Sequence, residues 1–199
     1  SLQDVVIQWS EKYGDDFSNF SDYNVFQLND THPSLAVAEL MRILMDDKKL
    51  SWEDAWKIVS QSMAYTNHTL LPEALERWPV SLFKKLLPRL LDIIYEINAR
   101  FLKVVAMKWP GDQVRQARMS IIDPGDNVCM AYLAIVGSFS INGVAALHSQ
   151  LLKEGLFHDF YELWPERFNN KTNGVTQRRW MASSTTFSRY GRKRYRGEI

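Results

Sequence analysis

The sequence has a single cysteine, no long apolar run and almost no excess of charge. Cys129 alone cannot form a disulfide within the chain and offers no cysteine cluster for a metal. No apolar run approaches the roughly 20 residues of a membrane-spanning helix. The 24 Lys and Arg against 23 Asp and Glu give a formal net charge of +1, which creates no field to attract nucleic acid or an anionic membrane. We therefore expect a cytoplasmic protein without metal, nucleic-acid or membrane partners.

The chain has the length and composition of one packed domain. It has 199 residues, of which 46% are hydrophobic and 24% charged, as in folded proteins rather than disordered ones. Its first residues contain no basic stretch followed by an apolar one, so we expect no signal peptide. The sequence also begins without methionine, which suggests a start inside a larger protein.

The first elements predicted are a strand, a loop and a helix. Residues 24–28 (NVFQL) are β-leaning and precede the turn-prone residues 29–31 (NDT), which predicts a buried strand ending in a functional loop. Loops at the carboxyl ends of strands are where α/β proteins place their sites. Pro33 can then occupy the first turn of a helix whose apolar residues recur at helical spacing as far as residue 44.

Two further helical patterns follow. Ser51 and Asp54 form a capping-box pattern, which predicts a helix from Ser51 to about residue 65. The longest helical pattern follows Pro79, and Pro88 is expected to kink its first turns.

The C-terminal half predicts one more strand and one more helix. Residues 128–136 (VCMAYLAIV) are uncharged, and we favour a buried strand there with a helix as the alternative. Residues 141–153 predict a helix, with Gly155 as its C-terminal cap. Strands separated by helices predict an α/β fold class.

A polar loop at residues 29–33 (NDTHP) is the first candidate site. It brings a carboxylate, a hydroxyl and an imidazole to the start of a predicted helix, whose amino end favours an anionic or oxygen-rich ligand. On the residues alone, a structural interpretation is favoured: Asp30 or Thr31 caps the helix, and His32 binds a local carbonyl.

The second candidate site lies at residues 65–69 (YTNHT) and 72–78 (PEALERW). Amide, imidazole and carboxylate groups can bind sugar hydroxyls while aromatic rings cover the C–H faces of the sugar. The equally weighted alternative is an ordinary loop and short helix in which Glu73 pairs with Arg77.

The sequence also bears on glycosidase and metal chemistry. The carboxylates of Asp30, Glu73 or Glu76 could serve a glycosidase, which needs a pair of carboxyl groups. No two histidines have metal-ligand spacing, and His148 is expected to pack or to face solvent rather than to catalyse.

Four ordered motifs resemble the α-glucan phosphorylases, the family that acts on glycogen, starch and maltodextrin. They are QLNDTHPS at residues 27–34, AYTNHTLLPEALERWP at 64–79, NGVA at 142–145 and KTNG at 171–174. The resemblance reaches to about Trp180, and it replaces the structural interpretations of both loops.

The resemblance implies a fold and an activity. The chain would be a helix-rich internal part of the N-terminal domain of a two-domain glycosyltransferase-B fold, in a family of cytoplasmic enzymes with allosteric members. Such enzymes transfer a terminal glucosyl unit from an α-1,4-glucan to inorganic phosphate, and the parent enzyme is expected to be a homodimer. Their cofactor, pyridoxal 5'-phosphate, relays a proton through its phosphate; its lysine is expected outside this chain.

Carried over by motif, the family's site residues fall on six positions. The resemblance implies that His68 and Asn173 bind the glucosyl unit as catalytic residues. Val144 would pack near that sugar, and Asp30 and His32 would lie on the glucan side of the cleft. The sixth position, Trp180, would lie close to the cofactor.

The end of the chain departs from the family pattern. Gln177 stands where the family usually has proline, and the tail at 182–199 is rich in Ser, Thr and Arg. We expect a partial phosphorylase domain at 1–181 and an aberrant, disordered basic tail at 182–199, from a frameshift or premature stop. Such a piece would not turn over alone; a non-catalytic glucan-binding fragment is the alternative, and a basic arm for RNA a minor one.

Overall fold

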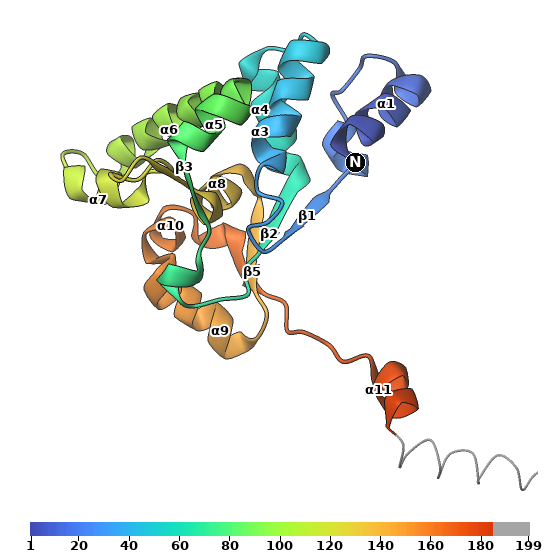
Figure 1. Ribbon diagram of the computed structural model, residues 1–199, viewed down its shortest axis with the longest axis vertical. Coiled ribbons are helices and arrows are strands. Elements are labelled where there is room, and N and C mark those ends of the chain that lie inside the picture. The colour runs from blue at the N-terminus through green and yellow to red at the C-terminus, as the bar shows by residue number, and fades with distance from the viewer. Residues whose placement is uncertain (185–199) are drawn as a thin grey trace, which may run out of the picture.

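A four-stranded parallel sheet is the centre of the computed structural model, which describes residues 1–184 (Figure 1). Its strand order is β1-β2-β5-β6, and one buried row crosses it, in which Leu28 pairs with Tyr65, Tyr65 with Ile141 and Ile141 with Phe168. A separate antiparallel pair joins β3 to β4. The strands are β1 (Phe26–Asn29), β2 (Met63–Thr66), β3 (Arg77–Pro79), β4 (Asn127–Cys129), β5 (Ser140–Gly143) and β6 (Phe168–Asn170).

Helices surround the sheet and make the chain an α/β protein, as predicted. Figure 1 shows α3 to α6 together at one end of the molecule and α9 and α10 nearer the other. The helices are α1 (Leu2–Tyr13), α2 (Phe20–Tyr23), α3 (Ala36–Arg42), α4 (Trp52–Ser62), α5 (Val80–Leu86), α6 (Pro88–Lys108), α7 (Gln113–Met119), α8 (Met130–Gly137), α9 (Ala146–Leu151), α10 (His158–Leu163) and α11 (Gln177–Ser183). Short 3-10 helices are η2 (Pro72–Ala74) and η4 (Pro165–Arg167), and π-helical turns are η1 (Ile43–Asp47) and η3 (Leu152–Leu156).

The predictions that relied on local signals are largely confirmed. Strand β1 overlaps the expected segment at residues 26–28, although only Leu28 of its four residues is buried. The side chain of Ser51 caps α4 by accepting a 3.1 Å hydrogen bond from the amide of Asp54. Helix α4 ends at Ser62 rather than near residue 65, because β2 begins at Met63. Pro88 does not kink one helix but starts a second one as the first residue of α6, where its missing N–H costs nothing.

The prediction of a strand at residues 128–136 is wrong for most of that range. Only the first two residues of this range belong to β4. The others lie in helix α8, which agrees with the helix given as the alternative. Helix α8 is buried nearly all round, so its sequence lacks the polar face that would reveal helical spacing. It packs so closely on α3 that a Cβ added to Gly137 would lie 2.5 Å from a methyl group of Val37.

Two helix starts were also placed wrongly. Residues 141–143 belong to β5, and α9 begins only at Ala146; Gly155 lies within η3 instead of capping a helix. Pro33 lies in a turn before α3, which begins at Ala36. Most of the predicted tail, residues 182–199, lies outside the described residues, which end just after α11.

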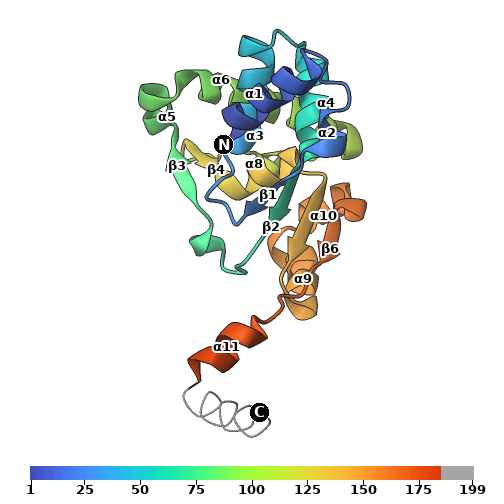
Figure 2. The same ribbon diagram turned by 90° about the vertical axis from the view of Figure 1, so that its right-hand side faces the viewer.

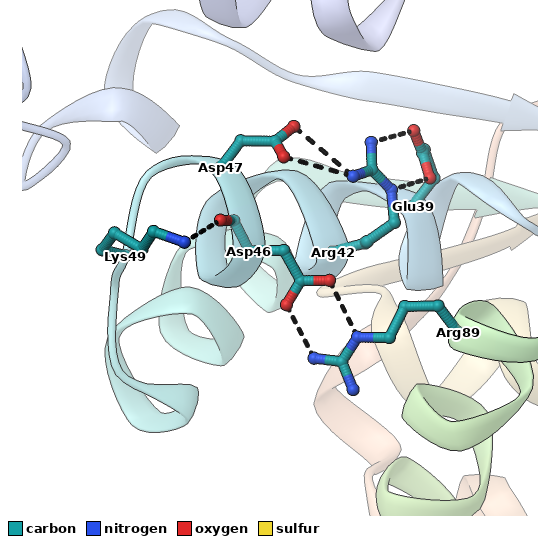
Figure 3. Close-up of polar contacts among 6 residues, drawn as sticks. All are labelled: Glu39, Arg42, Asp46, Asp47, Lys49 and Arg89. Atoms are coloured by element: carbon teal, nitrogen blue, oxygen red, sulfur yellow. Dashed lines mark hydrogen bonds and ion pairs between the residues drawn. The ribbon is translucent and has the colours of Figure 1, made fainter.

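Arginine–carboxylate pairs tie the helices together on the surface. Figure 3 shows Arg89 of α6 reaching Asp46 of η1, with two hydrogen bonds of 2.7 and 2.8 Å. The same view shows Arg42 held by Glu39 at 2.9 Å and by Asp47 at 3.3 Å. The Arg89–Asp46 pair holds α6 against the end of the α3–η1 segment, and the Arg42 contacts join α3 to η1.

Three aspartates have lowered pKa values, from which we expect the fold to lose stability in acid. The hydrogen bond from Arg89 holds the pKa of Asp46 below its usual value. Burial raises the pKa of Asp123, but hydrogen bonds from Asn127 and Arg77 lower it by more. Burial likewise raises the pKa of Asp159, and the hydrogen bond and charge of Arg118 outweigh this effect, so the pKa is lowered overall. Because their folded pKa values lie below the unfolded value of about 3.9, their stabilisation is complete above about pH 4 and is lost as pH falls through the folded values.

Urea unfolding between pH 7 and pH 3 measures this effect. We expect the contribution of these aspartates to be constant from pH 7 to pH 5 and to fall below pH 4. An Asp123→Asn variant should be about 2 kcal/mol less stable at pH 7, because Asp123 accepts four close hydrogen bonds from Gly125, Asn127 and Arg77. The gap to the unmodified chain should narrow at pH 3; an unchanged gap would contradict the assignment.

Candidate functional site

Polar side chains collect at the carboxyl edge of the parallel sheet. Since all four strands run in the same direction, their carboxyl ends meet at one edge. The Gln27 amide donates to the hydroxyl of Thr66 at 2.8 Å, and that hydroxyl donates to the Asn142 amide oxygen at 2.8 Å. This chain of hydrogen bonds fixes three neighbouring strands just before the loops that follow them.

Backbone hydrogen bonds continue past the strand ends and bring the predicted site residues together. The amide of Asp30 donates to the carbonyl of Thr66 at 2.9 Å, and the amide of Asn173 donates to the carbonyl of Val144 at 2.9 Å. His68 lies two residues beyond Thr66 in the loop after β2. Asp30, His68, Val144 and Asn173 therefore all lie at the carboxyl edge.

His68 is held by the last residue of β1. Its Nε2 is hydrogen bonded to the side-chain oxygen of Asn29, and because an amide oxygen only accepts, Nε2 is the donor. Next to it, Asn67 is fully buried; its amide donates to the hydroxyl of Tyr65 at 3.1 Å, and its oxygen accepts from the amide of Thr69 at 3.0 Å. Burial raises the pKa of Tyr65, so this hydroxyl stays protonated.

His32 points to a different partner from the one expected. Its Nδ1 lies 2.6 Å from a carboxylate oxygen of Glu76, and its side chain is 74% exposed. The capping interpretation is wrong, because no side chain caps α3; Asp30 instead has a φ of 62° and accepts a 2.7 Å hydrogen bond from the amide of Thr31. The predicted ion pair between Glu73 and Arg77 is also wrong, since Arg77 forms an ion pair with Asp123 at 2.6 Å.

An apolar hollow lies beside His32. It has a volume of about 270 Å³ and is lined by His32, Leu35, Trp78, Leu82, Phe83, Leu86, Leu87 and Met130. The aromatic ring of Trp78 is 44% exposed. The arrangement combines an aromatic face with the His32–Glu76 pair, which suits the two kinds of surface that a sugar presents.

A second histidine shapes the loop after β5. His148 was expected to pack or to be solvated; its Nδ1 accepts a 3.0 Å hydrogen bond from the amide of Val144, so it positions the residue that was predicted to contact the sugar. Ser149 donates at 2.8 Å to the amide oxygen of Asn170. Gly143 leaves room for both, because a Cβ there would lie 2.6 Å from the hydroxyl oxygen of Ser149. The four-residue spacing of Val144 and His148 on a loop-to-helix segment was the available sequence signal.

Trp180 is not brought to this edge. It lies in α11, which stands apart from the rest of the molecule in both views (Figures 1 and 2), and it is 67% exposed. The side chain of Asn173 is exposed as well, although its backbone is anchored at Val144.

Three further features of residues 1–184 concern metal binding, thiol chemistry and membrane spans. No group of three or more His, Cys, Asp or Glu side chains in this part of the chain is arranged to hold a metal ion. Cys129 is buried, and burial raises the pKa of its thiol to about 11, which keeps it unreactive. None of the described helices is both long enough and apolar enough to span a bilayer.

The chain belongs to the carbohydrate phosphorylase family, whose model matches residues 1–189. This family contains the proteins that the four motifs resemble. Among relatives, the chain is 59% identical over 187 residues to a glycogen phosphorylase of Synechocystis and 55% identical over 186 residues to glycogen phosphorylase 2 of Dictyostelium discoideum. It is 54% identical over 190 residues to the brain form of glycogen phosphorylase of Bos taurus.

These similarities cover nearly the whole chain but a small part of each relative. The matched segments include 91–92% of this chain and 19–22% of the three relatives. The chain therefore spans about a fifth of the length of the curated relatives it matches.

Proposed function

We propose that this chain forms part of an α-glucan phosphorylase, which transfers a terminal glucosyl unit from an α-1,4-glucan to inorganic phosphate. The observation that carries the proposal is the collection of Asp30, His68, Val144 and Asn173 at one edge of the sheet. These residues come from segments up to 143 positions apart, and the four family motifs supply all of them. Phosphorylase activity in relatives at 54–59% identity agrees with this assignment.

Each residue has a proposed role. His68 and Asn173 bind hydroxyls of the glucosyl unit, and Val144 packs against the same sugar. Asp30 and His32 lie on the glucan side, where Glu76 orients the imidazole of His32. Such contacts accelerate the reaction only if they hold the oxocarbenium-like transition state more strongly than the substrate.

Pyridoxal 5'-phosphate is proposed as the cofactor of the complete protein. No cofactor site forms around Trp180 among the described residues, since Trp180 is 67% exposed and α11 stands apart from the rest of the molecule (Figures 1 and 2). We propose that another part of the protein holds the cofactor and that Trp180 packs near it there. The two-domain glycosyltransferase-B fold, the homodimer and the cytoplasmic location belong to the same proposal.

Two alternatives make different predictions. A glycosidase would use Asp30, Glu73 or Glu76, but Glu76 is already paired with His32, and Asp30 accepts a local amide. A glucan-binding fragment would bind maltoheptaose without turnover. Because the chain spans about a fifth of the length of its relatives, we propose that by itself it does not catalyse transfer.

A chimera tests the proposal. The matched 187-residue segment of the Synechocystis glycogen phosphorylase is replaced by the corresponding residues of this chain, with which it is 59% identical. We expect the chimera to form glucose 1-phosphate from maltoheptaose and phosphate. A His68→Ala substitution should lower kcat/KM by about 100-fold, because it removes a hydrogen bond that is strongest in the transition state.

The control is His158→Ala, which removes an exposed histidine in α10, outside the carboxyl edge; its activity should be unchanged. A chimera that folds but gives no phosphate-dependent product would refute the assignment. Free glucose in phosphate-free buffer would favour the glycosidase, and maltoheptaose binding to the 199-residue chain, measured by calorimetry, would locate glucan affinity within it.

A further inference from the structure

Arg167 is a partly buried arginine that has no carboxylate partner among residues 1–184. Arginines between residues 40 and 120 are all in ion pairs, namely Arg42, Arg77, Arg89, Arg100, Arg115 and Arg118. Within residues 1–184, Arg167 has none: its Nη1 donates at 3.1 Å to the carbonyl of Ser138, and its guanidinium carbon lies 3.8 Å from the ring centroid of Trp164. A guanidinium has five N–H donors, so donors remain for another acceptor.

Its surroundings make an anionic partner favourable. Burial lowers the pKa of Arg167, and the nearby carboxylate of Glu166 offsets this only in part. Taking a cation out of water is costly unless an anion or several acceptors compensate it. Stacking on Trp164 and one carbonyl contact compensate part of that cost.

Arg167 lines a hollow large enough for a small organic molecule. The hollow has a volume of about 570 Å³, within the range of ligand pockets. Its walls are helices α4 and α6 with the segment around η4, and its aromatic lining consists of Trp52, Trp56, Phe101 and Trp164. Arg167 precedes β6 and its acceptor Ser138 precedes β5, so the guanidinium is at the amino end of the sheet, opposite the His68 edge.

The charges around the hollow are unbalanced. Four cationic and two carboxylate side chains line it. Both carboxylates are paired with Arg100: Glu96 lies 2.6 Å from it and Glu53 lies 3.1 Å from it. Lys57, Lys103 and Arg167 are left without an ion pair in the described part of the chain. Among the described lining side chains, Ser60 has the only aliphatic hydroxyl and there is no amide, so a neutral sugar would find few partners.

We propose that this hollow binds a small organic anion, a phosphate carried on a flat ring, with Arg167 as the anion-binding group. The planar guanidinium can donate two parallel hydrogen bonds to a phosphate. Trp56 is half-buried and lines the hollow one helical turn from Trp52, so its indole can stack on the ring. The site is separate from the glucosyl site and does not rest on the proposed transfer reaction.

Phenyl phosphate is a suitable probe, measured by quenching of tryptophan fluorescence and by calorimetry on the 199-residue chain. We expect saturable binding, with phenol and inorganic phosphate each binding at least tenfold more weakly, because each lacks one half of the recognised structure. Arg167→Gln should weaken phenyl phosphate about 10- to 100-fold. The matched control is Arg178→Gln, which removes an exposed arginine of α11 and should leave the affinity unchanged.

Three results would overturn the proposal. They are the absence of saturable binding at millimolar phenyl phosphate, equal affinity in Arg167→Gln, and binding that is lost in the chimera, which would show that protein covers the hollow. Arg167→Lys keeps the cation and guards against misfolding; it should bind more weakly than the unmodified chain but more tightly than Arg167→Gln. Maltoheptaose should not compete, since the two sites lie at opposite ends of the sheet.

Discussion

Replacing Phe157 with alanine is expected to lower the free energy of unfolding of the chain by about 3–5 kcal/mol. Phe157 is fully buried, and its ring centroid lies 6.4 Å from that of Tyr65 in β2 and 6.4 Å from that of Phe160 in α10. The truncation removes contacts to the sheet and to the C-terminal helices at once, and it leaves a cavity that a close-packed core fills only in part. Urea unfolding followed by circular dichroism measures the loss.

Phe139→Ala is the matched control, because it makes the same chemical change at a site that is 43% exposed. We expect it to cost about 1 kcal/mol or less. Tyr65→Phe is a milder test of the same cluster: it keeps the ring but takes away the acceptor of the buried Asn67 amide. If Phe157→Ala cost no more than Phe139→Ala, the C-terminal helices would not share a core with the sheet.

The parts of the fold that the sequence predicted are those with local causes. The Ser51 cap and the apolar stripe of α4 lie within a single helix, so their pattern is complete in the sequence. The predicted kink at Pro88 was wrong, since Pro88 instead begins α6, where its ring suits the first turn of a helix.

The parts that the sequence predicted wrongly depend on distant contacts. Helix α8 has no polar face because α3, α4 and β2 cover it, and an apolar run of that length is equally compatible with a buried strand. Residues 141–143 pair with β2 and β6, whose sequences lie more than 70 positions before and more than 20 after them. No local pattern encodes such pairings.

The sequence predicted which segments contribute to the candidate site but not which of their residues contact one another. The motifs pointed to the loops after β1, β2 and β5, yet nothing local links His32 to Glu76, which lies 44 positions away. The role of His148 in holding Val144 was likewise missed, because a histidine on a helix usually packs or is solvated. The sequence did not single out Arg167, because the lack of a carboxylate partner among residues 1–184 is visible only in the structure.

Gly143→Ala is expected to lower the phosphorolytic kcat/KM of the chimera by about 100-fold. The added Cβ would lie 2.7 Å from Nδ1 of His148 and 2.9 Å from the Cα of Ser149. A side chain can turn away, but a backbone atom cannot, so the end of β5 must shift. That shift would break the 3.0 Å hydrogen bond from Val144 to His148 and displace the Val144 carbonyl, which holds the backbone of Asn173 at 2.9 Å.

The matched control for this substitution is Gly155→Ala in η3, where an added Cβ meets no atom within 4 Å. Both variants gain one methyl group, and only Gly143→Ala has no room for it. Overpacking at Gly143 should also cost about 1–3 kcal/mol of stability, so unfolding and kinetics are measured on the same samples. A loss of activity at a temperature where both variants are fully folded would locate the effect in the loops proposed to bind the sugar. Full activity of Gly143→Ala would mean that Val144 and Asn173 do not depend on this close approach, and their proposed roles would fail together.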